Sequence, residues 1–231
     1  MGPETTSIFY LNLIKMARRY CDSYPSIVID NVSFPFSLEE GIIVKSRDEE
    51  LIRLLPILKE SVRRLNKIGV DFIVIPCNTV HVFIEKLREV SLVPILSIVD
   101  ETMKQVKTFG HKRVGLLATA KTVDNQLFEL PFKENEIDII LPTKKEQDIV
   151  SRTITKILES KITGKDEERL NKIIKGLIKR GAEAVVLGCT DLQIILNKYK
   201  FPVRLLDTMK ILADATFDKI KIKDENKIIG R

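Results

Sequence analysis

The chain is poor in the residues that build metal sites and disulfide frameworks. Among its 231 residues there are three cysteines, two histidines and no tryptophan. No two cysteines are spaced as Cys-x-x-Cys, and the only histidines, His81 and His111, are too few to complete a zinc site. We therefore expect no bound metal and no disulfide framework.

Long hydrophobic runs are also missing. No apolar stretch approaches the roughly 18 residues that a membrane span needs, and no basic segment leads into an apolar one at the N-terminus, as in a secretory signal. The hydrophobic fraction of 44% and charged fraction of 30% are ordinary for a globular protein. The sequence therefore predicts a cytoplasmic protein with no membrane partner.

Charge of one sign is not concentrated anywhere, although the net charge is +6. Lysines alternate with acidic residues, as in the stretches 144–148 and 165–169, which is typical of solvated helix faces. A nucleic-acid-binding protein would instead show a basic stripe. We therefore expect no nucleic-acid partner.

Short runs rich in Val and Ile alternate with longer amphipathic stretches. Near-continuous apolar runs are typical of parallel strands covered on both faces, so the pattern predicts an α/β fold. The predicted strands are Ser26–Asn31, Phe72–Pro76, Ile95–Ile98, Arg113–Ala118, Ile137–Leu141, Ala184–Gly188 and Val203–Leu206. The predicted helices are Thr5–Arg19, Glu49–Lys67, Val80–Glu89, Asp100–Phe109, Val123–Lys133, Glu146–Glu159, Glu167–Lys179, Asp191–Asn197 and Met209–Ile220.

One pattern occurs twice. Gly69 and Gly181 are each followed by an acidic residue two positions on, by an apolar run, and by a cysteine eight positions on, Cys77 and Cys189. A duplicated strand suggests two similar domains, each a parallel sheet flanked by helices, related by a pseudo-two-fold axis with the active site between them. We place the first domain at residues 1–98 plus 207–231 and the second at 99–206.

Both cysteines of the repeat follow a predicted strand, at the edge where parallel α/β sheets bind ligands. A lone cysteine there is usually a small buried apolar residue, but a matched pair, each followed by hydroxyl or amide side chains, indicates chemistry. Two thiols on opposite faces of a carbon can invert it, because one removes a proton while the other supplies one. Helix N-termini favour thiolates, and Asn78, Thr79 and Thr190 can donate hydrogen bonds to a substrate carboxylate.

At these residues the chain resembles the aspartate/glutamate racemase family. Pro-Cys-Asn-Thr-x-His at 76–81 and Gly-Cys-Thr-acidic at 188–191 match its motifs. The resemblance implies cofactor-independent isomerases, commonly homodimers, with Cys77 and Cys189 as the acid–base pair. It also implies substrate-binding roles for Thr119 and Thr122. The opening Met1–Thr6 resembles the end of the family's first turn, which places Met1 at the site and implies that the family's first strand is missing.

The resemblance leaves the substrate open. The acid after Thr190, Asp191, favours aspartate, yet the family's carboxylate-binding Arg has no counterpart near residues 31–38. Lys161 is the nearest match to the family's later Lys, although Glu159 aligns about as well. We therefore expect an amino acid or a dicarboxylate as the substrate. It is either aspartate, with Lys45 or Arg47 supplying the positive charge, or a related amino acid with a smaller or neutral side chain.

Other reactions also suit two facing cysteines. The alternatives are a hydantoin racemase, a maleate cis–trans isomerase, an arylmalonate decarboxylase-like enzyme, or a non-catalytic ligand-binding protein on the same fold. In an isomerase of maleate, one cysteine would attack as a nucleophile and form a covalent adduct. The Pro-Cys-Asn-Thr form of the first motif favours the amino-acid racemases.

Overall fold

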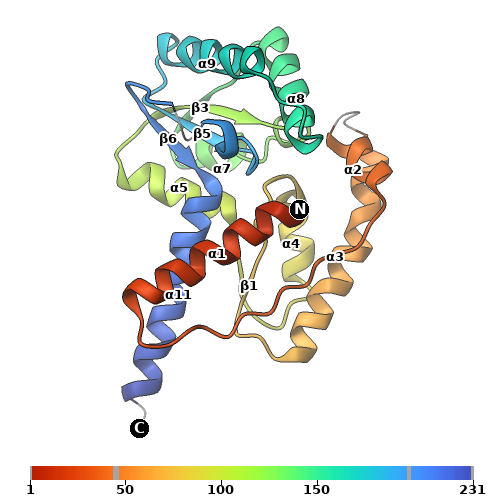
Figure 1. Ribbon diagram of the computed structural model, residues 1–231, viewed down its shortest axis with the longest axis vertical. Coiled ribbons are helices and arrows are strands. Elements are labelled where there is room, and N and C mark those ends of the chain that lie inside the picture. Colours follow the sequence, from red (N-terminus) through yellow and green to blue (C-terminus); the bar gives the residue numbers. More distant parts are fainter. Residues whose placement is uncertain (1, 44–46, 197–198, 230–231) are drawn as a thin grey trace.

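Two parallel sheets flanked by helices form the protein, which confirms the predicted α/β class (Figure 1). The computed structural model describes residues 2–43, 47–196 and 199–229, with 222–229 as backbone only. The larger sheet has the order β4-β3-β5-β6, with β3 Arg113–Ala118, β4 Asp138–Ile140, β5 Ala184–Gly188 and β6 Arg204–Asp207. The smaller sheet pairs β1 Ile73–Val74 with β2 Ile95–Leu96.

Helices surround both sheets. Those of the N-terminal half are α1 Pro3–Tyr20, α2 Phe36–Ile43, α3 Asp48–Ile68, the 3-10 helix η1 Thr79–Phe83, α4 Ile84–Arg88 and α5 Ile98–Thr108. The remainder are α6 Ala120–Asp124, α7 Glu129–Glu134, α8 Lys144–Leu158, α9 Gly164–Lys179, α10 Gln193–Leu196 and α11 Thr208–Ile229. The sequence did not predict α2, and it predicted one helix over 123–133 where α6 and α7 are separate.

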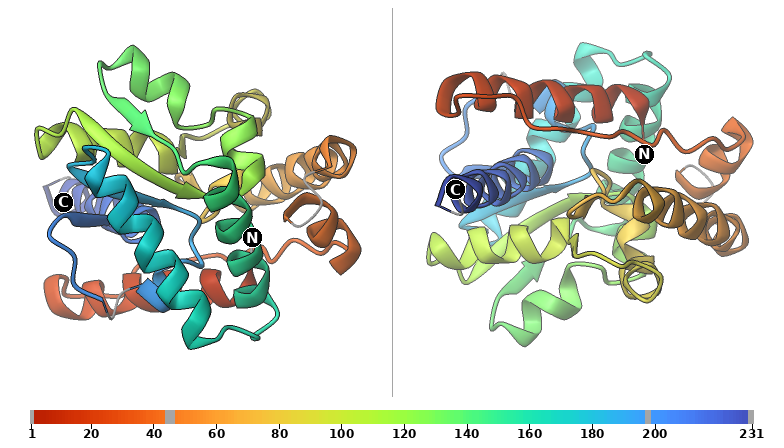
Figure 2. Two further views of the ribbon diagram at one scale, coloured as in Figure 1. Left: turned by 90° about the horizontal axis from the view of Figure 1, so that it is seen from above. Right: turned by 90° about the horizontal axis from the view of Figure 1, so that it is seen from below.

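The larger sheet and its helices occupy one half of the molecule, and β1, α3 and α4 occupy the other (Figure 1). Helix α11 packs against both α1 and α5, and Figure 2 shows it running between them. The predicted division at residues 98 and 207 separates β1 and β2 from β3, β4 and β5. The exact domain bounds stay a prediction.

Local sequence explains the duplicated motif. Helix α3 buries Leu51, Leu54, Leu58 and Val62 along one face, at the i, i+3, i+4 spacing of an amphipathic helix. It ends at Gly69, whose φ of +78° is the left-handed conformation that glycine adopts without strain. The second glycine of the repeat has a φ of +96° after α9. Each repeat therefore begins with the turn that leads a helix into a strand.

The predicted strand Ser26–Asn31 is wrong. These residues are extended, but they pair with no other strand among the described residues. Their apolar content is that of a strand, yet a groove lies between them and β1, so the two backbones do not form a ladder. Propensity alone cannot make a strand without a partner within hydrogen-bonding distance.

Candidate functional site

The two cysteines of the repeat lie at the carboxyl ends of strands from different sheets. Cys77 follows β1 and is half-buried, whereas Cys189 follows β5 and is 7% exposed. Asn78, next to Cys77, donates to Thr208, and Thr208 donates to the carbonyl of Leu187, two residues before Cys189. These hydrogen bonds connect the strand ends that carry the two cysteines.

The pKa of the Cys189 thiol is raised well above its ordinary value. Burial is the largest cause, and the negative charge of Asp191 is the next. The thiol donates to Oδ2 of Asp191 at 3.6 Å, and Thr5 Oγ1 donates to Oδ1 of the same carboxylate at 2.7 Å. The expectation that a helix N-terminus lowers this pKa is therefore wrong, because α10 is only one turn long and burial outweighs it. Cys189 is held as a neutral thiol, the form that donates a proton.

Three buried threonines form a hydroxyl cluster beside Cys77. Thr79 Oγ1 lies 3.2 Å from Thr119 Oγ1 and 3.3 Å from Thr122 Oγ1, and the last two are 2.9 Å apart. Thr79 begins η1, whereas Thr119 caps α6 after β3, so the cluster joins the ends of strands from both sheets. Hydroxyls grouped in a buried site can redirect their protons towards an anionic ligand.

Asn78 lies beside this cluster and is 2% exposed. Its Nδ2 donates to Thr208 Oγ1 at 3.0 Å, and Thr208 in turn donates to the carbonyl of Leu187 at the end of β5. Its Oδ1 is buried and has no hydrogen-bond partner in the described part of the chain. A buried acceptor of this kind is normally satisfied, so a ligand N–H is a fitting partner. Thr190, next to Cys189, is 7% exposed.

His81 fixes the backbone around Cys77. Ile98 N–H donates to its Nε2 at 3.1 Å, so Nδ1 carries the proton and donates to the Cys77 carbonyl at 2.7 Å. Burial lowers the pKa of His81 from 6.5 to about 4. A neutral imidazole with both nitrogens occupied acts on structure rather than on substrate.

The burial of neutral His81 predicts that the free energy of unfolding depends on pH. Between pH 6.5 and 4 the unfolded chain protonates His81 and the folded protein does not, so acid favours unfolding. We expect about 3 kcal/mol of unfolding free energy to be lost from this residue as the pH falls from 7 to 4. In urea denaturation, the free energy of unfolding of His81→Asn should fall less steeply between pH 7 and pH 4 than that of the unaltered protein. The control His111→Asn retains His81 and should therefore keep the loss that His81 causes. Equal pH slopes in His81→Asn and the unaltered protein would contradict this reading.

Lys121 is the site residue that the sequence did not reveal. It lies in α6 between Thr119 and Thr122, its side chain is 3% exposed, and its ammonium donates to the Asp48 carboxylate at the start of α3. A buried lysine is uncommon, but its sequence context, Ala-Lys-Thr, does not distinguish it from the many surface lysines. A small cavity of about 40 Å³, lined by Cys77, Thr79, Glu39 and Leu51 among others, separates the first cysteine from α2 and α3.

Two further predicted residues, Lys161 and Arg47, are exposed. Lys161 pairs with Glu159 at 3.0 Å, and 71% of its side chain is exposed. Arg47 is exposed and occupies the N-cap position of α3, where its side chain makes no capping hydrogen bond. Met1 and Lys45 lie outside the described residues. Among those described, no group of three His, Cys, Asp or Glu side chains is placed to hold a metal ion, and no helix is long and apolar enough to cross a membrane.

The fold and the site together define a class: parallel α/β proteins with a thiol at a strand end of each of two sheets. Comparison with known proteins identifies the family within this class. The family model for Asp/Glu/hydantoin racemases matches residues 1–216. A broad specificity amino-acid racemase of Bacillus subtilis is 27% identical, over 94% of this chain and 93% of its own length.

Solved structures agree in fold. An aspartate racemase homologue from Pyrococcus horikoshii superposes with a TM-score of 0.78 at 22% identity, covering 95% of each chain. The Picrophilus torridus aspartate racemase gives 0.73 at 22% identity, covering 95% of this chain and 90% of its own. This chain belongs to the Asp/Glu/hydantoin racemase family. Racemases are isomerases, so the family assigns this chain to the isomerases.

Proposed function

We propose that the protein is a cofactor-independent amino-acid racemase that acts on aspartate or a related amino acid by a two-base mechanism. The observation that carries this proposal is the pair of cysteines at the carboxyl ends of β1 and β5, two strand ends that the hydrogen bonds from Asn78 to Thr208 and from Thr208 to Leu187 connect. An α-proton is removed from one face by a thiolate and replaced on the other face by a thiol. In this scheme the buried thiol of Cys189 supplies a proton on one face while Cys77 takes the α-proton from the other, and the two roles exchange in the reverse direction.

The neighbouring polar groups suit an amino-acid zwitterion. The hydroxyls of Thr79, Thr119 and Thr122 supply donors for the α-carboxylate, where negative charge grows as the α-proton leaves. The unpartnered Oδ1 of Asn78 accepts from the α-ammonium, while its Nδ2 stays on Thr208. Thr190, beside the second cysteine, is a further donor.

Lys121 is the residue that would bind the side-chain carboxylate of a substrate such as aspartate. It is a buried cation one residue from the threonine cluster, and its present partner Asp48 is 78% exposed. A substrate carboxylate can replace Asp48 on the ammonium, whereas Asp48 is free to turn into water. This exchange supplies the charge that the family's missing Arg would otherwise give. Lys161, exposed and paired with Glu159, is the competing candidate.

The test is α-proton exchange in deuterated water, followed by mass spectrometry and chiral chromatography. Incubation with L- or D-aspartate should give deuterium at Cα together with the opposite enantiomer. Glutamate, alanine and serine define the side-chain range. No deuterium uptake from any of these amino acids would sink the amino-acid racemase proposal, and a maleate adduct on one cysteine would favour the cis–trans isomerase instead.

We further propose a cytoplasmic homodimer, on the family resemblance alone.

A further inference from the structure

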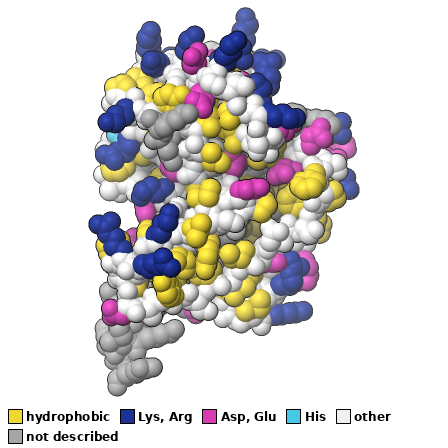
Figure 3. Space-filling view, in the orientation of Figure 1, with side chains coloured by type: hydrophobic (Ala, Val, Ile, Leu, Met, Phe, Trp, Pro, Cys, Tyr) yellow, Lys and Arg dark blue, Asp and Glu magenta, His cyan; other side chains and the backbone are white. Residues whose placement is uncertain are grey.

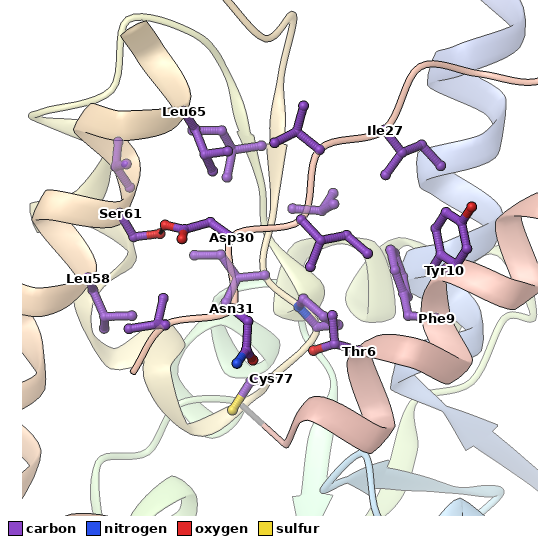
Figure 4. A pocket seen from close by; sticks show the side chains of 18 of the residues that line it. Thr6, Phe9, Tyr10, Ile27, Asp30, Asn31, Leu58, Ser61, Leu65 and Cys77 are labelled. Carbon is purple, nitrogen blue, oxygen red and sulfur yellow. Dashed lines mark hydrogen bonds between the residues drawn. The ribbon is translucent and has the colours of Figure 1, made fainter. Parts of the chain in front are cut away.

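The small cavity beside Cys77 has room for a short side chain. Its volume of about 40 Å³ holds about three atoms the size of a water molecule, since one such molecule needs roughly 10–15 Å³. Thr79, a member of the hydroxyl cluster, lines this cavity together with Cys77. Figure 4 shows Cys77 at one end of a different and larger pocket, of about 150 Å³, which Thr79 does not line. Of these two spaces, the small cavity is the one that adjoins both the first thiol and the hydroxyl cluster.

Helices α2 and α3 form most of the wall of this cavity. The two helices pack closely because Gly41 has no side chain, and a Cβ there would lie 2.7 Å from Cγ of Glu50. The residues of these helices that line the cavity are Glu39, Ile42, Ile43, Leu51 and Leu54. Phe34, which precedes α2, and Val80 complete the lining. The helical side of the cavity is therefore apolar apart from one carboxylate.

That carboxylate, Glu39, is half-buried and makes no hydrogen bond or ion pair with any residue that the structure describes. It is also the only charged residue among the described ones that line the cavity. A second carboxylate in this space would be repelled by Glu39 and would lose its hydration against apolar walls. The side chain of aspartate is therefore placed elsewhere, at Lys121 in the proposed function.

The surface over α2 has the same character as the cavity. Figure 3 shows hydrophobic and acidic side chains next to one another over this helix. The helix contains two acidic residues and no basic one, and its first residue, Phe36, is 89% exposed. Such a surface suits a molecule that combines an apolar stem with a terminal hydrogen-bond donor, because the stem contacts apolar atoms and the donor meets a carboxylate.

We propose that the cavity is a subsite for α-amino acids whose short side chain ends in a hydrogen-bond donor. This inference rests on the proposed racemase function and adds a second class of substrate to aspartate. The hydroxyl cluster around Thr79 holds the α-carboxylate, and Cys77 reaches the α-carbon. Two methylene groups then lie against the leucines and isoleucines of α2 and α3, and the terminal group donates to Glu39. Amino acids of this length are 2,4-diaminobutyrate, which ends in an ammonium, and homoserine, which ends in a hydroxyl.

The test compares substrates that differ in one terminal group. Norvaline is the matched reference, because its side chain has the same number of non-hydrogen atoms but no donor. We expect kcat/KM for 2,4-diaminobutyrate and for homoserine to exceed that for norvaline at least about tenfold, as measured by α-deuterium uptake. Among the diamino acids, 2,3-diaminopropionate is one atom shorter and ornithine is one atom longer, and both should be poorer substrates than 2,4-diaminobutyrate.

Two variants of Glu39 separate the charge from the hydrogen bond, with every rate expressed relative to that of aspartate. Glu39→Gln keeps an acceptor oxygen, so homoserine should keep its relative rate, whereas 2,4-diaminobutyrate should lose about tenfold. Glu39→Leu removes the acceptor, so both should fall to the level of norvaline. Glu49→Gln is the control, because Glu49 is an exposed acid in the first turn of α3 that does not line the cavity. It should leave every ratio unchanged.

Failure of the subsite can be told apart from failure of the proposed function. Deuterium uptake from aspartate, together with equal kcat/KM for norvaline and 2,4-diaminobutyrate, would overturn the subsite alone. Unchanged ratios in Glu39→Leu would have the same consequence. No uptake from any amino acid would overturn the racemase function and the subsite with it.

Discussion

Cys77→Ala and Cys189→Ala should each lose racemisation in both directions by at least about a thousandfold. Inversion needs a proton leaving one face and another arriving at the opposite face, so removing either thiol removes half of the exchange. The measurement is the rate of enantiomer formation from L- and D-aspartate, with thermal unfolding as the check on folding. Cys21→Ala is the matched control, because Cys21 has no counterpart in the repeat, and its turnover should be unchanged.

The two variants should also differ in a way that a purely structural role would not produce. A variant that keeps one thiol retains one acid–base group, so slow α-deuterium exchange without inversion is expected for one enantiomer only. Cys77→Ala and Cys189→Ala should favour opposite enantiomers. Turnover in Cys77→Ala at the rate of the unaltered protein would contradict the two-base mechanism.

The environment of Cys189 sets the pH dependence of this chemistry. Burial, and after it the charge of Asp191, hold the pKa of the Cys189 thiol high, so the thiol form persists to alkaline pH. The second hydrogen bond of Asp191, from Thr5, links the start of α1 to the end of β5. The acid after the Gly-Cys-Thr motif thus has a local physical role, which is to keep one of the two cysteines protonated. This role holds for any substrate, so Asp191 by itself says little about which amino acid binds.

Sequence patterns predicted those parts of the site that local chain geometry determines. Cys77 and Cys189 were found because each ends a strand that begins after a left-handed glycine, and that unit is visible as a repeat. The pairings across the molecule were not visible. Thr5 with Asp191, Asn78 with Thr208 and Lys121 with Asp48 are separated by 186, 130 and 73 residues, and no local period encodes such distances.

The errors in the fold have the same physical origin. Residues 26–31 have the composition of a strand, but a strand exists only where a neighbouring backbone accepts its hydrogen bonds. Helix α2 was missed because Phe36–Ile43 is short and contains Gly41, which lowers its intrinsic helix propensity. It is stabilised by packing on α3, where Leu38 and Ile42 are buried. Tertiary contacts therefore determine the secondary structure of both segments.

Lys121→Met should lower kcat/KM for aspartate by about 10- to 100-fold and leave α-proton exchange of alanine nearly unchanged. A charge-assisted hydrogen bond to a carboxylate contributes about 1.5–3 kcal/mol, which corresponds to that range. Alanine has no side-chain carboxylate and should therefore be insensitive to the loss of this cation. The ratio of the two kcat/KM values reports specificity independently of the fraction of enzyme that folds.

Two matched variants distinguish the loss of a substrate contact at Lys121 from the loss of another lysine or of the Lys121–Asp48 ion pair. Lys161→Met removes an exposed lysine, 71% accessible, and should leave the aspartate-to-alanine ratio unchanged. Asp48→Asn keeps Lys121 but removes its present partner, so aspartate binding should be maintained or strengthened because the substrate no longer competes with that carboxylate. A ratio that falls in Lys161→Met and not in Lys121→Met would move the specificity role to Lys161. A ratio that falls equally in Asp48→Asn and Lys121→Met would show that the ion pair positions α3 and does not bind substrate.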